Sequence, residues 1–269
     1  MHSIPIDREA TAARLRRRCR TTGRARFTAL LVLLLLVCSS SARAGAFRVS
    51  PIRIDLVGGA RGGGVVNVIN EGQEPISFQI KAMAWSQDPA GKDIYTDTSD
   101  LVFFPQLMTT AAGETKVVRV GTKAPPPPRE KSYRLFIEEI PQRKENEGAV
   151  VRIAIRFGVP VFHLPAVVKK EGLLEEARVQ RGSFSWRIRN TGNVHLQVHE
   201  VELAAKDESG AEVFRDKPSG WYILVGGTRE QSFVIPPEVC GRIRALSVTA
   251  RAEEVTLSRE LAAAEGWCP

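Results

Sequence analysis

The residue types that most often carry chemistry are sparse in this sequence, and histidine shows this first. Beyond residue 44 the chain has three histidines, which are His163, His195 and His199. His195 and His199 are four residues apart, so on a strand both lie on one face about 13 Å from each other, too far for one metal ion. We therefore expect these two histidines at the surface, and we predict neither a metal site nor a cofactor.

Carboxylates and nucleophiles form no recognisable active-site motif either. Glu138 and Glu139 are adjacent, so a strand would point them to opposite faces. The sequence has no H-E-x-x-H or G-x-S-x-G motif, and glycine-rich residues 58–64 lack the Gly-Lys-Ser/Thr ending of a phosphate loop. We predict that the protein is not an enzyme. A hydrolase whose carboxylates converge only in the folded chain stays open as an alternative.

The first 44 residues have the composition of an export signal. Arginines are concentrated in residues 1–26, an apolar run of 12 residues occupies 27–38, and small residues follow up to an Ala-Arg-Ala site. These are the parts of a cleaved secretory signal, and the apolar run is too short for a permanent membrane helix. We predict a signal peptide at residues 1–44, cleaved after Ala44, and a mature protein in the periplasm. A lipoprotein site at Cys38, twin-arginine export and an uncleaved anchor are the alternatives.

The charge and cysteine content of residues 45–269 fit an exported protein. The leader holds nine of the 38 Lys and Arg and two of the 30 Asp and Glu, so the remainder carries a net charge of about +1 instead of +8. A near-neutral chain gives no electrostatic reason for nucleic-acid binding, and we predict none. Cys240 and Cys268 are the two cysteines that remain, and an even pair in an oxidising compartment predicts a structural disulfide.

Alternating apolar residues predict an all-β protein. Apolar residues recur at every second position in short segments separated by turn residues, which is typical of a β-sandwich. The candidate strands are residues 49–54, 65–69, 76–80, 117–120 and 133–140.

A repeated motif predicts two domains. An Asn-x-Gly turn between apolar strands occurs at Asn70 and again, 120 residues later, at Asn190. Asn and Gly tolerate the left-handed backbone of tight hairpins, so we predict a hairpin at each place. The repeat predicts two similar sandwiches, residues 45–165 and 166–269, with the boundary just after Pro165.

Residues 150–162 are unusual because their apolar face is long. Val151, Ile153 and Ile155 share one parity of this strand, and Arg156 belongs to the other. The strand is either a core strand or an edge strand, and its place before the domain boundary favours an edge. A long apolar edge aggregates unless another strand pairs with it. We therefore expect the strand to lend side chains to the incomplete sheet of another protein.

Taken in order, these segments resemble the periplasmic pilus or fimbrial assembly chaperone family. Residues 49–54 look like its first strand, residues 68–72 like its apolar strand and Asn turn, and residues 133–141, which end in Glu-Ile-Pro, are similar to its most recognisable run. Residues 150–162 then stand where the family has its donor strand. The resemblance covers most of the first domain, whereas the second domain shares only the Asn-x-Gly turn.

The resemblance implies two immunoglobulin-like β-sandwiches in an L-shaped arrangement and a chaperone that binds pilus subunits by donor-strand complementation before an outer-membrane usher assembles them. In that role Val151, Ile153 and Ile155 fill the open groove of the subunit. Arg53 would bind the C-terminal carboxylate of the subunit through parallel charge-assisted hydrogen bonds. A self-capping dimer of the free chaperone is a further expectation.

One position departs from the best-known members of the family. They place a lysine in the cleft where this chain has Pro160, a pattern that looks more like the archaic or spore-coat-U-type branch. Arg156 has the same parity as Pro160 and is the candidate replacement for the lysine. The alternative function is an extracytoplasmic two-domain immunoglobulin-like binding or adhesive module. That alternative requires Ile153 to be a core residue, so the burial of Ile153 separates the two functions.

Overall fold

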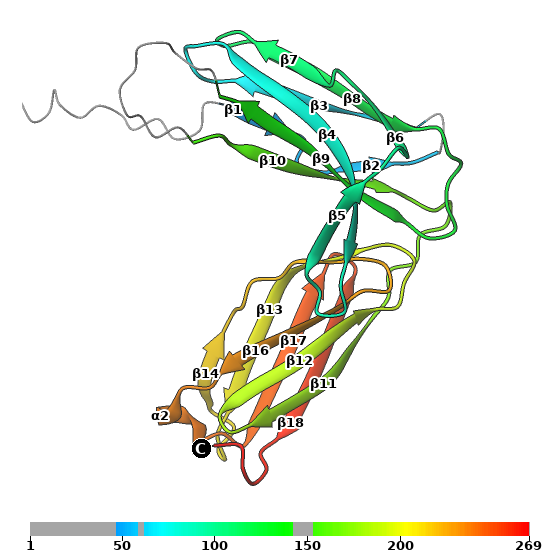
Figure 1. Ribbon diagram of the computed structural model, residues 1–269. Helices are drawn as coiled ribbons and strands as arrows, with labels where there is room; N and C mark the ends of the chain where they lie inside the picture. Colours follow the sequence, from blue (N-terminus) through cyan, green and yellow to red (C-terminus); the bar gives the residue numbers. More distant parts are fainter. Residues whose placement is uncertain (1–46, 59–61, 142–152, 269) are drawn as a thin grey trace, which may run out of the picture. The chain divides into compact units, whose positions relative to one another are not determined.

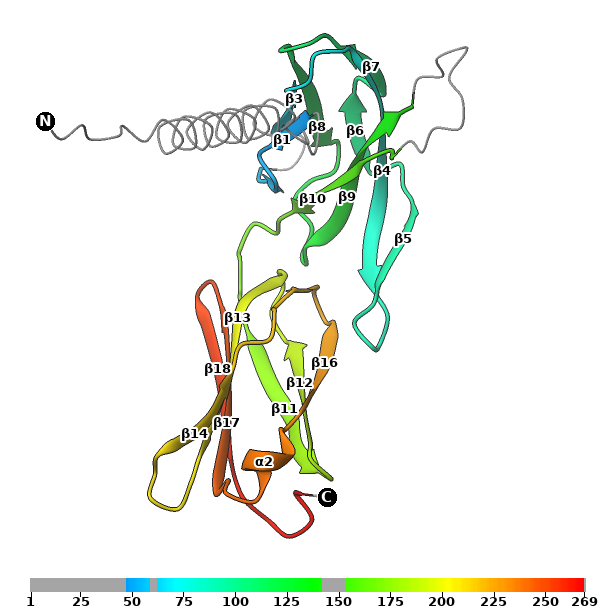
Figure 2. The same cartoon turned by 90° about the vertical axis from the view of Figure 1, so that its left-hand side faces the viewer.

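The computed structural model describes residues 47–58, 62–141 and 153–268. The predicted signal peptide and Val151 lie outside the described residues. Strands dominate the described chain and form four sheets that make two sandwiches (Figures 1 and 2), which confirms the all-β prediction. Both sandwiches belong to one compact unit, Ala46–Pro269, and the predicted L-shaped arrangement stays a prediction. Among the described residues, no helix has the length and apolarity that a membrane span requires.

The first sandwich consists of two facing sheets. One sheet has the strand order β1-β3-β8-β6, and the other has the order β2-β10-β9-β4-β5, with β7 paired to β4. The strand bounds are β1 Phe47–Ser50, β2 Ile54–Leu56, β3 Gly63–Asn70, β4 Ile76–Gln87, β5 Asp93–Asp97, β6 Leu101–Phe104, β7 Leu107–Thr110, β8 Thr115–Thr122, β9 Lys131–Ile140 and β10 Arg156–His163.

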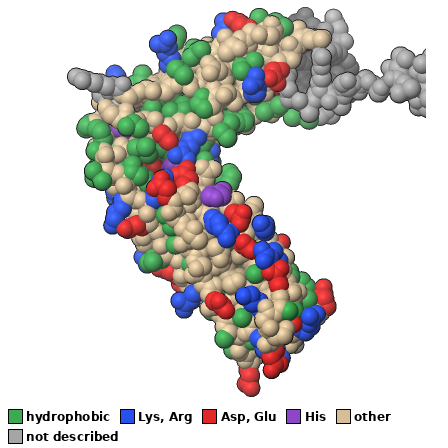
Figure 3. All heavy atoms as spheres, turned by 180° about the vertical axis from the view of Figure 1, so that it is seen from behind, with side chains coloured by type: hydrophobic (Ala, Val, Ile, Leu, Met, Phe, Trp, Pro, Cys, Tyr) green, Lys and Arg blue, Asp and Glu red, His purple; other side chains and the backbone are tan. Residues whose placement is uncertain are grey.

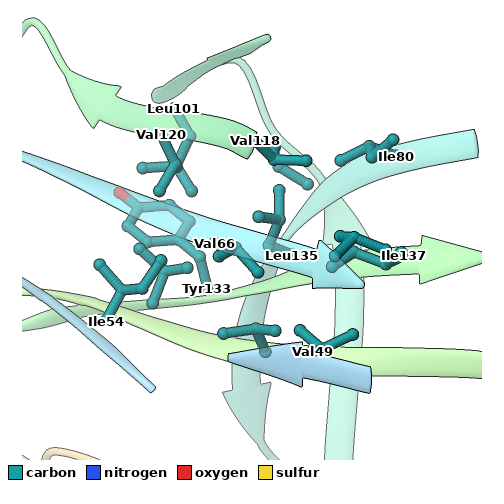
Figure 4. Packing of buried hydrophobic residues seen from close by; sticks show 14 of the residues in the cluster. Val49, Ile54, Val66, Ile80, Leu101, Val118, Val120, Tyr133, Leu135 and Ile137 are labelled. Atoms are coloured by element: carbon teal, nitrogen blue, oxygen red, sulfur yellow. The ribbon is translucent and has the colours of Figure 1, made fainter. Parts of the chain in front are cut away.

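Alternate apolar side chains of the strands build the core of the first sandwich. In β9, Tyr133, Leu135 and Ile137 are buried, and they meet Val66 and Val118 from the opposite sheet (Figure 4). Burying each such side chain contributes about 1.5–3 kcal/mol to the free energy of folding. The apolar residues that alternate in the predicted strand 133–140 therefore form the inward face of a central strand.

The second sandwich repeats this plan with its own core. Its sheets have the orders β11-β12-β16 and β14-β13-β17-β18, with β15 paired to β13. Phe184 and Trp186 are fully buried at its centre, and a disulfide joins Cys240 to Cys268 with 5.8 Å between their Cα atoms. The bounds are β11 Gly172–Gln180, β12 Ser183–Asn190, β13 Leu196–Lys206, β14 Glu212–Asp216, β15 Tyr222–Ile223, β16 Thr228–Val234, α2 Pro237–Cys240, β17 Ala245–Ala252 and β18 Val255–Ala262.

The two Asn-x-Gly turns have the same structure, but neither is the predicted hairpin. β3 and β4 belong to different sheets, and so do β12 and β13, so each turn carries the chain from one sheet to the other. Neither asparagine, nor the glycine two residues after it, has a positive φ. The hairpin prediction is wrong because the amide side chain, and not a left-handed backbone, shapes the turn.

Three hydrogen bonds fix each of these turns. Asn70 accepts one from the backbone N–H of Gly72 at 2.9 Å and donates two from Nδ2 to the carbonyl oxygens of Glu74 and Thr110 at 2.8 and 2.9 Å. The side chain of Asn190 makes the same three bonds at the same distances in the second sandwich, with Gly192, Val194 and Ile223. Because a buried amide satisfies backbone groups of two segments, each asparagine ties one turn to a neighbouring strand.

β10 has strand partners on both sides over only part of its length. It pairs with β9 throughout, from Arg156 to His163, but with β2 only from Val161 onward. In the described chain β10 is therefore an edge before Val161 and an interior strand after it. Ile155 extends this edge, because its carbonyl oxygen accepts a hydrogen bond from the N–H of Glu139 at 3.0 Å. β10 ends and β11 begins on either side of the predicted boundary after Pro165.

Candidate functional site

The apolar face of β10 runs out of the core into solvent. Val159 and Val161 are fully buried, and Phe157 packs only partly against the core. Toward the start of the segment, Ile155 is partly exposed and Ile153 is 81% exposed. The alternate side chains of this face are thus buried in the core at the end of the segment and exposed to solvent at its start. The binding-module alternative requires Ile153 to be a core residue, and this exposure contradicts that requirement.

Arg53 lies where the free edge of β10 ends. It directly precedes Ile54, the residue of β2 that pairs with Val161 of β10. Since β2 occupies the same side of β10 as the free edge, a strand added along that edge stops at the start of β2. The end of an added strand would therefore lie next to Arg53.

Carboxylates already surround the guanidinium of Arg53. Asp55 accepts from Nε at 3.0 Å and from Nη2 at 2.8 Å, and Glu253 accepts from Nη1 at 2.8 Å. Hydrogen bonds to Asp55 raise the pKa of Arg53, burial opposes that shift, and the bond to Glu253 adds to it. Lys170 binds Glu253 as well, and the hydrogen bonds from Lys170 and Arg53 lower the pKa of Glu253 to about 2.

An aromatic cluster contacts both Arg53 and a second arginine, Arg134. The cluster consists of Trp85, Phe162 and Tyr222, with ring centroids 5.5–5.9 Å apart. The Cζ of Arg53 lies 5.7 Å from the Phe162 ring, and the Cζ of Arg134 lies 3.9 Å from the Trp85 ring. Burial raises the pKa of the Tyr222 hydroxyl, and the charges of Arg53 and Arg134 oppose that shift. Both cations therefore act on one hydroxyl.

Arg134 is a buried cation without an ion pair in the described part of the chain. Its side chain donates from Nη1 to the carbonyl oxygen of Gly158 at 3.2 Å, while its Nε has no hydrogen-bond partner. Arg134 lies opposite Pro160 in the pairing of β9 with β10, so it shares a sheet face with the position of the family lysine. Sequence reasoning missed Arg134. The available signal was a basic residue in the middle of a strand, on the same face as Phe136.

Arg156, the predicted replacement for the lysine, is not part of this arrangement. It is exposed, lies 3.6 Å from the carboxylate of Glu138, and stacks its guanidinium 3.7 Å from the ring of Phe136. Arg156 is thus already paired near the start of β10, four residues before Pro160.

His195 is buried, which corrects the expectation of a surface histidine. Its Nδ1 lies 2.8 Å from a carboxylate oxygen of Glu130, and its ring stacks on Phe162 with 3.7 Å between centroids. Both side chains are almost fully shielded from solvent. The prediction failed because Glu130 is 65 residues away in the sequence, and only tertiary folding brings it to His195. Within the described residues, no three His, Cys, Asp or Glu side chains are grouped closely enough to hold a metal ion.

Exposed apolar surface is concentrated on the first sandwich. Figure 3 shows hydrophobic side chains gathered there, whereas acidic and basic side chains are interspersed over the second sandwich. Cross-strand ion pairs account for the interspersed charges, such as Arg187 with Glu230 and Arg251 with Glu202, each at 3.1 Å. The free edge of β10 therefore belongs to the sandwich that has more of the large exposed hydrophobic side chains in the described chain.

Comparison with known proteins agrees with this architecture. A chain of the CsuC–CsuE chaperone–tip adhesion subunit complex from the archaic Csu pili of Acinetobacter baumannii is 20% identical, with a TM-score of 0.54 over 79% of this chain and 98% of that one. The class 5 fimbriae chaperone CfaA is 17% identical, with a TM-score of 0.52 over 81% and 100%. A chain of the Salmonella enterica SafA pilin–SafB chaperone complex is 13% identical, with a TM-score of 0.52 over 82% and 99%. At these identities the likeness establishes the fold.

The family itself is identified from the sequence of the first sandwich. No curated protein matches the sequence significantly. Residues 46–169, however, match the family described as pili and flagellar-assembly chaperone, PapD N-terminal domain. This match spans the whole first sandwich, including β10 and the preceding segment. The first sandwich therefore belongs to the pilus assembly chaperone family.

Proposed function

We propose that this protein is a periplasmic chaperone that binds pilus or fimbrial subunits by donor-strand complementation. The observation that carries the proposal is the edge of β10, whose apolar face leaves the core and ends in the exposed side chain of Ile153. Such an edge pairs readily with a strand of another protein. Two similar structures support the class of partner, because they are complexes of a chaperone with a tip adhesion subunit and with a pilin.

Donor-strand binding divides into a backbone part and a side-chain part. The main chain of residues 153–160 hydrogen-bonds to the edge of the subunit's sheet, and the side chains of alternate residues enter its groove. Ile153 and Ile155 are the described members of that alternate set, and Val151 continues it outside the described residues. Full burial of an isoleucine that was exposed contributes about 1.5–3 kcal/mol, so two or three such side chains account for substantial affinity.

The C-terminal carboxylate of the subunit would bind between Arg53 and Arg134. Arg53 lies at the end of the free edge, and Arg134 contributes the cation that no carboxylate neutralises among the described residues. Arg134 thereby takes the role of the lysine that the best-known family members have at the position of Pro160. Arg156, in contrast, is paired with Glu138 and serves only to cover Phe136.

The remaining parts of the proposal concern the setting. The protein would act without catalysis, metal or cofactor, and an outer-membrane usher would receive the loaded chaperone. In the absence of a subunit, two free β10 edges would pair in a self-capping dimer, because an apolar edge favours any available strand.

Substitution of Ile153 tests the proposal. The tagged protein is purified from the periplasm of its native host, and co-purifying proteins are identified by mass spectrometry. Ile153→Asp should abolish capture of a small β-rich exported protein, because a carboxylate cannot enter an apolar groove unpaired. Val234→Asp is the matched control, since Val234 is 73% exposed on the second sandwich and should leave capture unchanged. Equal capture by wild type and Ile153→Asp would refute the proposal.

A further inference from the structure

The donors of Arg53 are almost fully used in the free protein. An arginine has five N–H donors. Asp55 accepts hydrogen bonds from the Nε–H and from one N–H of Nη2. Glu253 and Gln197 accept from Nη1 at 2.8 and 3.3 Å. A carboxylate that binds an arginine bidentately needs two parallel donors. An incoming carboxylate therefore finds no free pair on Arg53 while Glu253 stays in place.

We propose that Glu253 is an internal competitor for the carboxylate site of Arg53, held there in the free chaperone and displaced by the C-terminal carboxylate of a subunit. The inference rests on the proposed function, because it assigns the incoming anion to the subunit. It adds an exchange step: one carboxylate leaves Arg53 as another arrives, and Asp55 stays bound throughout.

The positions of the two carboxylates explain why Glu253 leaves and Asp55 stays. Asp55 lies in β2, its backbone pairs with Phe162 of β10, and its carboxylate contacts two nitrogens of Arg53. Glu253 lies in the turn between β17 and β18, and its carboxylate contacts only Nη1 of Arg53. Moving Glu253, a turn side chain with one contact to Arg53, costs less free energy than moving Asp55, a strand side chain with two contacts to Arg53.

Lys170 provides Glu253 with a second partner. The ammonium of Lys170 binds the other carboxylate oxygen of Glu253 and also lies 3.1 Å from Glu254. Once displaced from Arg53, Glu253 thus remains paired with Lys170 and is not left as an isolated charge. Because an ion pair in contact with water is weak, this exchange is reversible on binding and release.

The exchange makes the site selective for a free chain terminus. A carboxylate replaces Glu253 charge for charge, so the guanidinium keeps its ionic partner. A neutral amide or an internal carbonyl would leave Arg53 with one less anion, and it would not displace Glu253. Glu253 therefore improves discrimination in favour of subunits whose C-terminus is exposed and complete.

Acetate is the probe that tests this inference without any subunit. The mature chain, labelled with ¹⁵N in its arginine side chains, is titrated with sodium acetate at constant ionic strength. The Nε–H signal of Arg53, assigned by its loss in Arg53→Lys, reports binding. Glu253→Gln should bind acetate about two- to fivefold more tightly than wild type, the equivalent of losing one exposed ion pair.

Glu254→Gln is the matched control. It makes the same change of charge in the same turn and removes a contact with Lys170, but Glu254 does not contact Arg53. Its acetate affinity should stay within about twofold of wild type. Glu253→Asp, which keeps the charge on a shorter side chain, should also bind acetate more tightly than wild type if contact with Arg53 matters. Equal acetate affinities for Glu253→Gln and Glu254→Gln would overturn the inference and would leave capture through Ile153 unaffected.

Discussion

Replacing Arg134 by methionine should weaken subunit binding without unfolding the protein. Among the described residues, the guanidinium of Arg134 has no carboxylate partner and its Nε has no hydrogen-bond partner, so its charge is poorly compensated. A methionine keeps an unbranched apolar stem against Trp85 and makes favourable sulfur–aromatic contacts. It removes a cation–π contact of about 0.5–2 kcal/mol, but it also removes an unsatisfied buried donor of about 1–3 kcal/mol. The free energy of unfolding should therefore change by less than about 1 kcal/mol.

The effect on binding should be much larger. A hydrogen bond between ionised partners contributes about 1.5–3 kcal/mol, which corresponds to a loss of about 10- to 150-fold in affinity for the subunit. Calorimetry with the purified subunit measures this loss, and urea unfolding followed by tryptophan fluorescence measures stability. The control is Arg156→Met, which removes an exposed arginine of the same sheet and should change affinity by less than about twofold.

The pattern across the two variants decides between the two cations. Wild-type affinity in Arg134→Met would refute the assignment of Arg134 to the carboxylate site. A selective loss in Arg156→Met would restore Arg156 as the replacement for the family lysine. A large fall in stability of Arg134→Met would show that Arg134 is chiefly a packing residue.

Two further predictions concern stability. Asn190→Asp should lower the free energy of unfolding by about 2–4 kcal/mol, because it leaves two buried carbonyl oxygens without donors and buries a charge. Asn193→Asp, at a partly exposed position, loses one donor to Val167 and should cost less than about 1 kcal/mol. Urea midpoints of the two variants measure the difference, and equal midpoints would contradict the reasoning. The pKa of Glu253 is lowered from 4.5 to about 2, so its ion pairs stabilise the folded state above pH 4.5 and lose this effect as the pH falls toward 2. Since the side chain of Glu253 is 36% exposed, this stabilisation should stay below about 1 kcal/mol. The difference in Tm between wild type and Glu253→Gln should therefore be a few degrees at pH 7 and should vanish near pH 2.

The sequence by itself determined the class of fold and indicated the segment that we propose to bind subunits. Alternation in residues 133–140 and 151–161 is a local property, because the side chains of a strand point to opposite faces whatever the rest of the chain does. The same is true of the two Asn-x-Gly turns, whose repeat identified two similar sandwiches. The run ending in Glu-Ile-Pro then allowed the family to be recognised from the first sandwich alone.

Tertiary structure alone decided what each local pattern is used for. The repeat of Asn70 and Asn190 could not show that the following strand enters the other sheet, since that depends on strand pairing across the sandwich. The sequence of β10 likewise could not show where its edge is free, because that is set by β2, about 100 residues earlier in the chain.

The charged residues of the site depend most on tertiary contacts. His195 is buried where Glu130 lies against it, and Glu253 binds Arg53 from 200 residues away. Arg134 packs against aromatic rings and has no carboxylate partner among the described residues. Whether an ionisable side chain is paired, buried or available depends on neighbours within a few ångströms, and in a β-sandwich most of these neighbours are distant in sequence. The residue types were visible in the sequence, but only the fold determined their partners.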